Sequence, residues 1–396
     1  MKNRRHIDVI TKYFYPVTAG IESNIIETYS VLAKMGWSVT VHTTKSTLNE
    51  VNILRSNEMN RGIKIMRYPS HYFGFTPIID YRKTNLICLH NFDIFPHLFI
   101  LLRATFHQLT STKSYGIFLT PHGGFTPEWP TFSLLSRVLK WLYHSTFGLI
   151  MINQMTDGVR AISNWEKQAL AKVCVKSRKI VLIENGLDPS ARLPHSSLVS
   201  PKIKHLTHDL KTYIISIGRI APIKNYETII KAISLIPSKL KLVIIGPVQN
   251  EKYRASLEHL ARKLSVSDRV IFLGVIRGSD KYYLVTQALL FIHMAKWESF
   301  CNVVYEAMSL GKICVVADNT ALSSLIKNNK TGISTPTFDS VKLAHILTSI
   351  HKGKSTKIIK IIQTNLHTMH FPSWTETAKA MHYTYLQIVQ SYAKNI

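Results

Sequence analysis

The sequence has few cysteines and no long apolar run, and each shortage excludes a class of protein. Its four cysteines are scattered over 396 residues and form no CxxC pair. This spacing argues against a disulfide framework and against a structural zinc site. Because no run of about 18 to 20 apolar residues occurs, we expect no membrane-spanning helix. The basic N-terminal segment lacks the apolar stretch of a signal peptide, so we expect a cytoplasmic protein.

Acidic residues are also scarce. The chain has 49 Lys and Arg against 23 Asp and Glu, a formal net charge of +26. Such an excess predicts an anionic partner, and phosphorylated metabolites, anionic lipid head groups and nucleic acid all fit. The sequence has no RNP-type aromatic signature, zinc finger or basic zipper, so we expect no nucleic-acid partner. A basic nucleic-acid-binding protein is the alternative from another class, and peripheral contact with the inner face of a membrane also suits the charge.

The hydrophobic pattern repeats an alternation of strands and helices in two series. Strand and helix patterns alternate within 1–190 and again within 212–371, an order that predicts parallel sheets. Between the two series, 191–211 is rich in Pro, Ser and His and has neither period, which predicts a linker. The last part, 372–396, has helical period, and we expect it to pack back on the first domain. The sequence thus predicts an α/β protein with two Rossmann-like, doubly wound domains facing a cleft.

Two cations follow the first strand of the second series. In GRIAPIKN, Gly218 and Arg219 come just after the strand and Lys224 precedes the next helix. Open α/β sheets bind ligands at the carboxyl ends of their strands. An Arg fork and a Lys point charge at that edge suit a diphosphate. An ordinary surface loop with solvated cations is the alternative.

Two glutamates occur later in the same series, in ESFCNVVYEAMSLGKICVVA. Glu298 falls in a loop after a strand, and Glu306 falls on the second turn of a helix that Asn302 opens. Helix N-termini attract phosphate, and a carboxylate nearby accepts hydrogen bonds from sugar hydroxyls. The alternative is that Glu298 caps the helix and Glu306 is solvated or salt-bridged.

Together these segments resemble glycosyltransferase family 4, a family of retaining enzymes with the GT-B fold. GRIAPIKN, LVIIGP, VIFLG and ESFCNVVYEAMSLGKICVVA match its donor-nucleotide domain in order and spacing. YFYPVTAGIESNIIETYSVLAKMGWSVTVHT is similar to its first strand–helix unit with the glycine loop. AISNWEKQAL, KIVLIENGLD and FPSWTETAKAMHYTYLQIV are similar to its interdomain approach and closing helix, so the resemblance covers nearly the whole chain.

The resemblance implies a role for each motif residue. Arg219 and Lys224 would hold the donor pyrophosphate, Glu306 the ribose, and Glu298 the transferred sugar. Backbone N–H groups near the donor would come from four consecutive residues: Phe300, Cys301, Asn302 and Val303. Gly20 would let the backbone approach phosphate and sugar. Two positions depart from the family pattern, because Ala19 precedes Gly20 where two glycines are common, and Cys301 stands where glycine is common.

A histidine follows a strand of the first series, in PHGGFTPEW. His122 would contact the donor sugar or the acceptor, as a histidine in a similar place does in relatives. The alternative is a loop histidine satisfied by the backbone of a glycine turn.

Several catalytic motifs are missing from the sequence. It has no DxD, HExxH or GxxxxGK[ST] motif, so we expect neither a metal nor another cofactor. The resemblance implies a front-face, retaining transfer from a nucleotide-diphosphate sugar to a hydroxyl of a glycan or lipid-linked acceptor, held by the first domain. Another GT-B enzyme, an epimerase or a phosphorylase, is the alternative within this fold.

The segment SLLSRVLKWLYHSTFG has a helical pattern that mixes large apolar residues with Arg137, Lys140 and His144. Such a helix can rest on an anionic bilayer and admit a lipid-linked acceptor. A core-packing helix with a basic outer face is the alternative.

Overall fold

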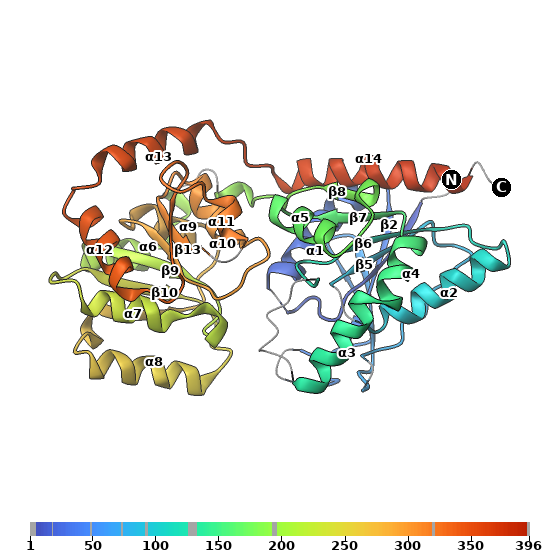
Figure 1. Ribbon diagram of the computed structural model, residues 1–396, viewed down its shortest axis with the longest axis horizontal. Helices are drawn as coiled ribbons and strands as arrows, with labels where there is room; N and C mark the ends of the chain where they lie inside the picture. The colour runs from blue at the N-terminus through green and yellow to red at the C-terminus, as the bar shows by residue number, and fades with distance from the viewer. Residues whose placement is uncertain are drawn as a thin grey trace. The chain divides into compact units, whose positions relative to one another are not determined.

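The computed structural model describes residues 5–17, 19–47, 50–72, 74–91, 94–125, 133–191, 196–318 and 321–393. The chain divides into two compact units (Figure 1). The first comprises Met1–Gly186 and Pro372–Ile396, and the second comprises Leu187–Phe371. That the units share a cleft stays a prediction.

The first unit is built on a sheet with eight strands among its described residues. Their spatial order is β3-β4-β2-β1-β5-β6-β7-β8, and every pair is parallel except β3 with β4. The strands are β1 (His6–Ile10), β2 (Ser38–Thr44), β3 (Asn57–Asn60), β4 (Ile63–Tyr68), β5 (Leu86–His90), β6 (Gly116–Thr120), β7 (Gly158–Ala161) and β8 (Ile180–Leu182). Strands β2, β3 and β4 lie on one side of β1, and β5 to β8 lie on the other side. The order of the strands therefore reverses between β1 and β5.

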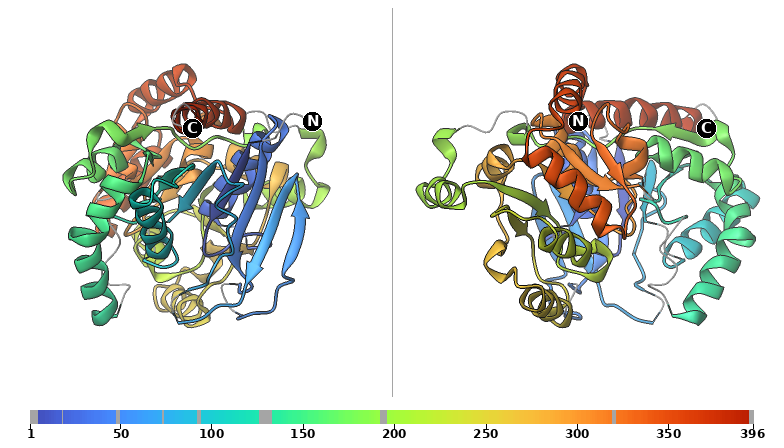
Figure 2. Two further views of the ribbon diagram at one scale, coloured as in Figure 1. Left: turned by 90° about the vertical axis from the view of Figure 1, so that its right-hand side faces the viewer. Right: turned by 60° about the vertical axis from the view of Figure 1, so that its left-hand side comes forward.

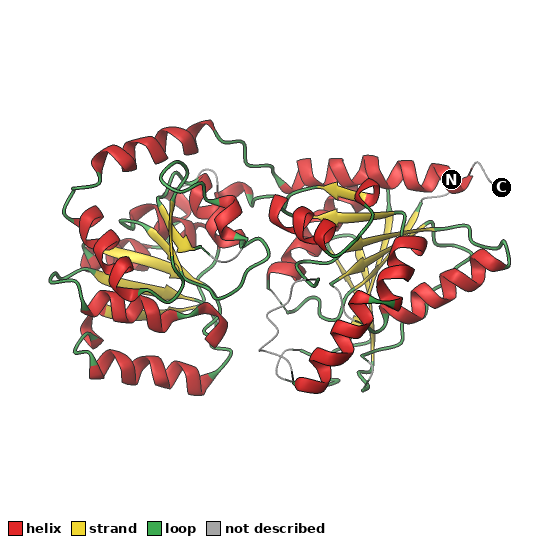
Figure 3. Cartoon of the chain, in the orientation of Figure 1, coloured by secondary structure: helices red, strands yellow, loops and turns green. Residues whose placement is uncertain are grey.

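Helices cover both faces of this sheet (Figure 3). They are α1 (Gly20–Lys34), α2 (His97–Leu109), α3 (Leu134–Ser145), α4 (Phe147–Met155), α5 (Asn164–Lys172) and α14 (Trp374–Ala393), with 3₁₀ turns η2 (Ser177–Lys179) in this unit and η3 (Pro189–Ala191) just beyond it. Within β5, Leu86 and Cys88 pack into the core beneath α1 and α14, whereas Ile87 and Leu89 pack into the core beneath α2 and α4. Burial on both faces explains why this strand is a continuous apolar run.

The second unit has a parallel sheet of six strands among its described residues, in the order β11-β10-β9-β12-β13-β14. The strands are β9 (Tyr213–Ile217), β10 (Lys241–Ile245), β11 (Val270–Gly274), β12 (Phe291–His293), β13 (Cys314–Ala317) and β14 (Ile333–Thr335). The helices are α6 (Pro201–Leu210), α7 (Tyr226–Ser234), α8 (Glu251–Lys263), α9 (Gly278–Gln287), α10 (Asn302–Ser309), α11 (Leu322–Leu325), α12 (Ser340–His351) and α13 (Thr356–Thr368), with 3₁₀ turns η4 (Ser196–Leu198), η5 (Pro222–Lys224) and η6 (Ser267–Arg269). The predicted pair of Rossmann-like folds is confirmed, and this sheet reverses between β9 and β12.

The loops that follow β9 and β10 approach each other closely. Gly246 follows β10 with φ at +152°, and a Cβ built on it would lie 2.0 Å from the carbonyl oxygen of Gly218. Only glycine fits at this position, which explains the glycine of LVIIGP.

Two expectations about local structure are wrong. The segment 191–211 contains helix α6, which Ser200 caps by accepting the N–H of Ile203, and it belongs to the second unit. The segment is rich in histidine and lysine, and this composition obscured the amphipathic pattern of α6. The buried positions of that pattern are Ile203 and Leu210. The helical pattern around 133–148 forms two helices, α3 and α4, which break at Thr146.

Among the residues that the structure describes, no helix combines the length and the apolar character needed to cross a bilayer.

Candidate functional site

Opposite charges meet where two neighbouring strands of the second unit end. Lys224 closes η5 after β9, and Glu298 lies in the loop after β12. Because β9 and β12 are adjacent and parallel and flank the point of reversal, both loops emerge at the same edge of the sheet. The Lys224 ammonium forms an ion pair with Glu298 Oε1, and His293 Nε2 lies 2.8 Å from the same oxygen. The structure thus brings together two of the predicted residues at the expected edge.

The Lys224–Glu298 pair is well shielded from solvent, with side chains 15% and 13% exposed. Burial alone would raise the pKa of Glu298, but the Lys224 ammonium and the hydrogen bond from His293 lower it from 4.5 to about 2. Burial lowers the pKa of His293, so its neutral ring donates the Nε2 proton to the carboxylate. Glu298 therefore stays ionised at neutral pH.

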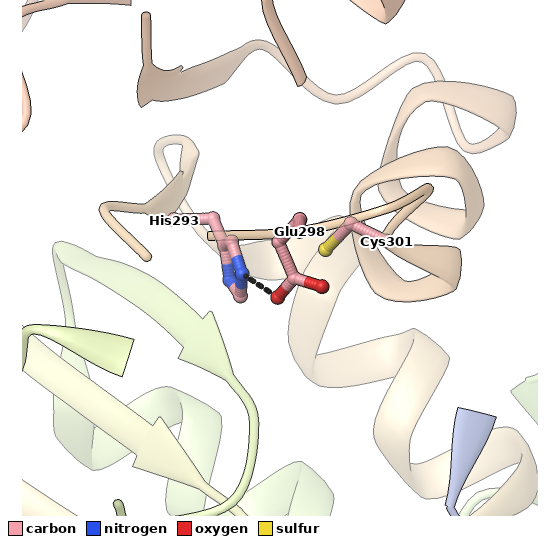
Figure 4. Close-up of side chains that lie close together, drawn as sticks. All are labelled: His293, Glu298 and Cys301. Atoms are coloured by element: carbon pink, nitrogen blue, oxygen red, sulfur yellow. Dashed lines mark hydrogen bonds and ion pairs between the residues drawn. The ribbon is translucent and has the colours of Figure 1, made fainter. Parts of the chain in front are cut away.

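The same loop brings together side chains of the types that bind metals. One ligand atom each from His293, Glu298 and Cys301 lies within 4.8 Å of the others (Figure 4). Burial raises the pKa of the Cys301 thiol well above its usual value, which keeps it protonated, and Lys224 already compensates the carboxylate charge. Both effects oppose a metal ion here, because zinc requires ionised thiolate ligands.

Arg219 lies at the same strand end as Lys224 but has a different partner. Its Nη1 donates to Gln249 Oε1 at 2.8 Å, and among the described residues it forms no hydrogen bond or ion pair with Lys224 or Glu298. The alternative of solvated cations is therefore wrong for Lys224. Within the part of the chain that the structure describes, Arg219 bonds to a neutral amide and forms no ion pair, so no carboxylate there compensates its charge.

Glu306 lies on α10, as the sequence predicts, and forms a separate ion pair. Its Oε2 lies 2.9 Å from Lys281 Nζ of α9, and Tyr282 Oη donates to its Oε1 at 3.3 Å. The salt-bridged alternative for this residue is thus what the structure contains. The carboxylate stays 16% exposed, so it retains capacity to accept further hydrogen bonds.

Helix α10 begins where the resemblance places the backbone donors. Asn302 and Val303 form its first turn, and Phe300 and Cys301 precede them. Cys301 is the N-cap, with φ at 73°, and it makes no side-chain capping bond. Glu298 therefore does not cap this helix. The left-handed backbone of Cys301 explains why glycine suits that position in the family.

Gly20 does not lie within a loop, because it is the first residue of α1. It follows Ala19, the N-cap, and is exposed. The N-terminus of α1 lies on the chain just after β1, beside the point of reversal in the first sheet. The helix end rather than a glycine loop is what the first unit presents there.

His122 is buried at the carboxyl end of β6, and its partner is a side chain rather than a backbone group. Its Nε2 lies 3.0 Å from His90 Nδ1, and His90 Nε2 lies 2.9 Å from the hydroxyl of Tyr29. That hydroxyl is also 2.9 Å from the hydroxyl of Tyr385 on α14. Burial lowers the pKa of His122 to about 3, so its ring is neutral. Thr126 to Trp129 of the same motif lie outside the described residues.

A buried carboxylate holds the loop that carries His122. Glu166, in the first turn of α5, accepts the N–H of Gly123 and, at 2.8 Å, the N–H of Ile162. Burial raises the pKa of this carboxyl to about 7. The fully buried guanidinium of Arg160 donates to the carbonyl of Ile183 at 2.8 Å. These contacts connect β6, β7 and the chain after β8.

Several of these partners are not evident in the sequence. His90 and His293 are each the last residue of a buried strand. A single polar residue at the end of an apolar run is a sequence pattern that indicates such positions. Lys281 lies on a helix with no such signal, so its contact with α10 depends on tertiary packing alone.

The chain matches two family models. Residues 18–191 match the model described as Glycosyltransferase Family 4, and residues 202–362 match Glycosyl transferases group 1. An uncharacterized glycosyltransferase of Methanocaldococcus jannaschii is 29% identical over 160 residues. This match covers 39% of this chain and 40% of that protein. The GDP-mannose-dependent alpha-mannosyltransferase of Mycolicibacterium smegmatis is 22% identical over 340 residues, 83% of each chain.

A solved structure shares the fold. HepE of Anabaena, in complex with UDP and glucose, superposes with a TM-score of 0.72 at 18% identity, covering 96% of this chain and 99% of that one. The two family models lie on the two units in turn. The chain therefore belongs to the family 4 glycosyltransferases and has the GT-B fold.

Proposed function

We propose that this protein transfers a sugar from a nucleotide-diphosphate donor to a hydroxyl of a glycan or lipid-linked acceptor, with retention of configuration. The observation that carries the proposal is the Lys224–Glu298 ion pair at the carboxyl ends of β9 and β12. A relative that uses GDP-mannose and a neighbour that holds UDP and glucose support a nucleotide-sugar donor.

The donor's charges are matched by the second unit. Arg219, whose guanidinium donates to the neutral amide of Gln249, binds the pyrophosphate with its guanidinium fork, and Lys224 adds a second cation. The N-terminus of α10, where Asn302 and Val303 form the first turn, favours the same anion through the helix dipole. Glu306, which forms an ion pair with Lys281, accepts hydrogen bonds from the ribose hydroxyls. Arg219, Lys224 and the N-terminus of α10 stabilise the charge of the leaving diphosphate, so no metal is required.

The chemical step breaks the bond between the anomeric carbon and the diphosphate oxygen and forms a bond to the acceptor oxygen on the same face. The acceptor proton passes to the leaving phosphate oxygen, which balances the charge. Glu298, with its pKa near 2, is too weak a base to take this proton and instead holds the sugar hydroxyls. His122, neutral and oriented by His90, contacts the sugar or the acceptor.

The test is a binding and transfer assay with UDP-, GDP- and ADP-sugars. The stabilising donor should yield free nucleotide diphosphate together with an elongated glycan. Arg219→Ala should abolish thermal stabilisation by the nucleotide and leave the fold intact, because its loss strands no buried charge. Lys224→Ala should do the same at some cost in stability. Lys263→Ala on α8 is the matched control, and unchanged nucleotide affinity in both Arg219 and Lys224 variants would refute the proposal.

A second part of the proposal concerns where the acceptor is met. Helix α3 exposes a continuous apolar surface, the α3 face, formed by Leu134, Leu135, Val138, Leu139, Trp141 and Leu142, which are 49–77% exposed. Helix α4 packs against both α3 and α2, and the three helices lie on one side of the first unit (Figure 2). Helices α2 and α4 also carry exposed apolar side chains, among them Phe106 and Ile150. An apolar face of this size with Arg137 and Lys140 beside it fits an anionic bilayer.

Vesicle sedimentation tests the α3 face directly. The protein should bind vesicles containing phosphatidylglycerol and bind pure phosphatidylcholine weakly. The double variant Leu135→Glu, Leu139→Glu should lose binding, whereas Leu235→Glu, at an exposed apolar site of the second unit, should retain it. Equal binding by both variants would exclude this face as the contact.

A further inference from the structure

A cavity opens in the first unit at the opposite end of the sheet from His122. His122 lies two residues after the end of β6, whereas Lys113 lies three residues before its start. Asp157 and Lys179 likewise precede the first residues of β7 and β8. The cavity measures about 580 Å³, and these three residues line it together with Arg178. It is therefore separate from the site at the carboxyl ends of the strands.

Three cations line this cavity against one carboxylate. The Lys113 side chain is only 8% exposed, and its ammonium lies 3.8 Å from Asp157 Oδ2 and donates to the hydroxyl of Tyr392 at 2.5 Å. The Lys179 ammonium donates to the carbonyl of Thr156, at the end of α4. Neither lysine therefore extends freely into solvent, and both charges are held at the cavity.

Asp157 carries a single negative charge, so it balances only one of the three cations, and its two oxygens also accept hydrogen bonds. One accepts the N–H of Ile117 at 2.8 Å, and the other accepts the hydroxyl of Tyr392 at 2.9 Å. Arg178 is exposed, and within the described ranges it forms no hydrogen bond or ion pair. Burial lowers the pKa of Lys179, and the neighbouring cations, Arg178 among them, lower it as well. Asp157 has the opposite effect on this pKa. The cavity therefore holds positive charge that the protein leaves uncompensated.

We infer that this cavity, which we call the basal cavity, binds a phosphate group. Arg178 supplies a guanidinium fork with its donors unused, and Lys113 and Lys179 supply two fixed ammonium groups. Phosphate neutralises this cluster with one ligand, since its several oxygens accept from three donors at once. A soluble phosphate ester and a phospholipid head group both carry this group. The inference concerns a second anion site and does not depend on the proposed sugar transfer.

Binding also has a structural consequence that an experiment can detect. Lys113 and Asp157 both hold Tyr392, near the end of α14. Phosphate in the basal cavity strengthens this junction, so hydrogen exchange in the last turns of α14 should slow on binding.

Calorimetric titration with inorganic phosphate tests the inference in solution, at constant ionic strength set with chloride. The Arg219→Ala background removes the proposed donor site from the measurement. In that background, Arg178→Gln should weaken phosphate binding about tenfold, the loss expected for one charge-assisted hydrogen bond. Lys172→Gln, an exposed charge change at the end of α5, should leave it unchanged. Both variants should bind the donor nucleotide normally when Arg219 is intact.

Vesicles containing phosphatidylglycerol provide the lipid arm, with the same two variants. If Arg178→Gln loses vesicle binding and Lys172→Gln does not, a lipid head group is the source of the phosphate. If Arg178→Gln weakens phosphate binding in the titration but leaves vesicle binding unchanged, the source is a soluble ester. Phosphate and vesicle binding that both ignore Arg178→Gln would overturn the inference. Equal weakening by Lys172→Gln would also overturn it, because general charge would then explain the binding.

Discussion

Replacing Glu298 with Gln should cost the second unit about 3 kcal/mol of unfolding free energy at neutral pH. The pKa of this carboxyl falls from 4.5 to about 2 in the folded protein, which corresponds to about 3 kcal/mol of preferential interaction with the ionised form. Glutamine keeps the shape and can still accept the proton of His293, but it removes the charge that Lys224 faces. The side chain is 13% exposed, so solvent screens little of the effect.

The same change should remove a pH dependence. Because the folded pKa is depressed, the stabilisation is complete above pH 4.5 and is lost as the pH falls toward about 2. Wild-type protein should therefore weaken across this interval, and Glu298→Gln should lack that component.

Trp297 is the one tryptophan within Leu187–Phe371, so ¹⁹F NMR of 5-fluorotryptophan reports on this unit during guanidinium unfolding. Glu258→Gln is the control, because its pair with Arg254 is exposed on α8 and should contribute less than about 0.5 kcal/mol. A Glu298→Gln variant as stable as this control, with an unchanged pH profile, would refute the reasoning.

Three further predictions concern buried groups. The pKa of Glu166 is raised to about 7, so wild-type stability should fall by about 3 kcal/mol between pH 4.5 and 7, and urea unfolding of Glu166→Gln should lack this fall. Gly246→Ala should cost more than about 3 kcal/mol in thermal unfolding, since its Cβ meets a backbone oxygen, whereas Gly274→Ala, with open space around it, should cost only about 1 kcal/mol. Tyr29→Phe should cost about 1–3 kcal/mol, because it leaves buried hydroxyl and imidazole partners unsatisfied, and its effect should not add to that of His90→Phe in a double-mutant cycle.

The sequence was sufficient for those features that follow from chain order. Alternating strands and helices determine which strand ends share an edge, so Lys224 and Glu298 were predictable neighbours once β9 and β12 were placed. The positions of Glu306 and of the start of α10 followed from helical period in the same way. The partners of these residues did not follow, because Lys281 reaches Glu306 only when α9 packs beside α10.

Local composition misled where tertiary packing decided the outcome. The Pro-, Ser- and His-rich stretch before β9 forms α6, because burial of Ile203 and Leu210 stabilises a helix whose own signal is weak. The apolar pattern of α3 suggests burial equally well, and only the structure shows that Leu135 and Trp141 face outward. Periodicity identifies an apolar face but not what covers it.

The core of the first unit includes Met381 and Tyr385 of α14, which packs on α1. During synthesis, the ribosome completes the whole second unit before these side chains emerge. Until then, α1 covers this face of the sheet without α14, whereas the second unit is synthesised as one uninterrupted stretch. We therefore expect the nascent first unit to bind chaperones through its incompletely covered core. A premature stop before α14 would release a protein whose second unit is folded and whose first unit is not.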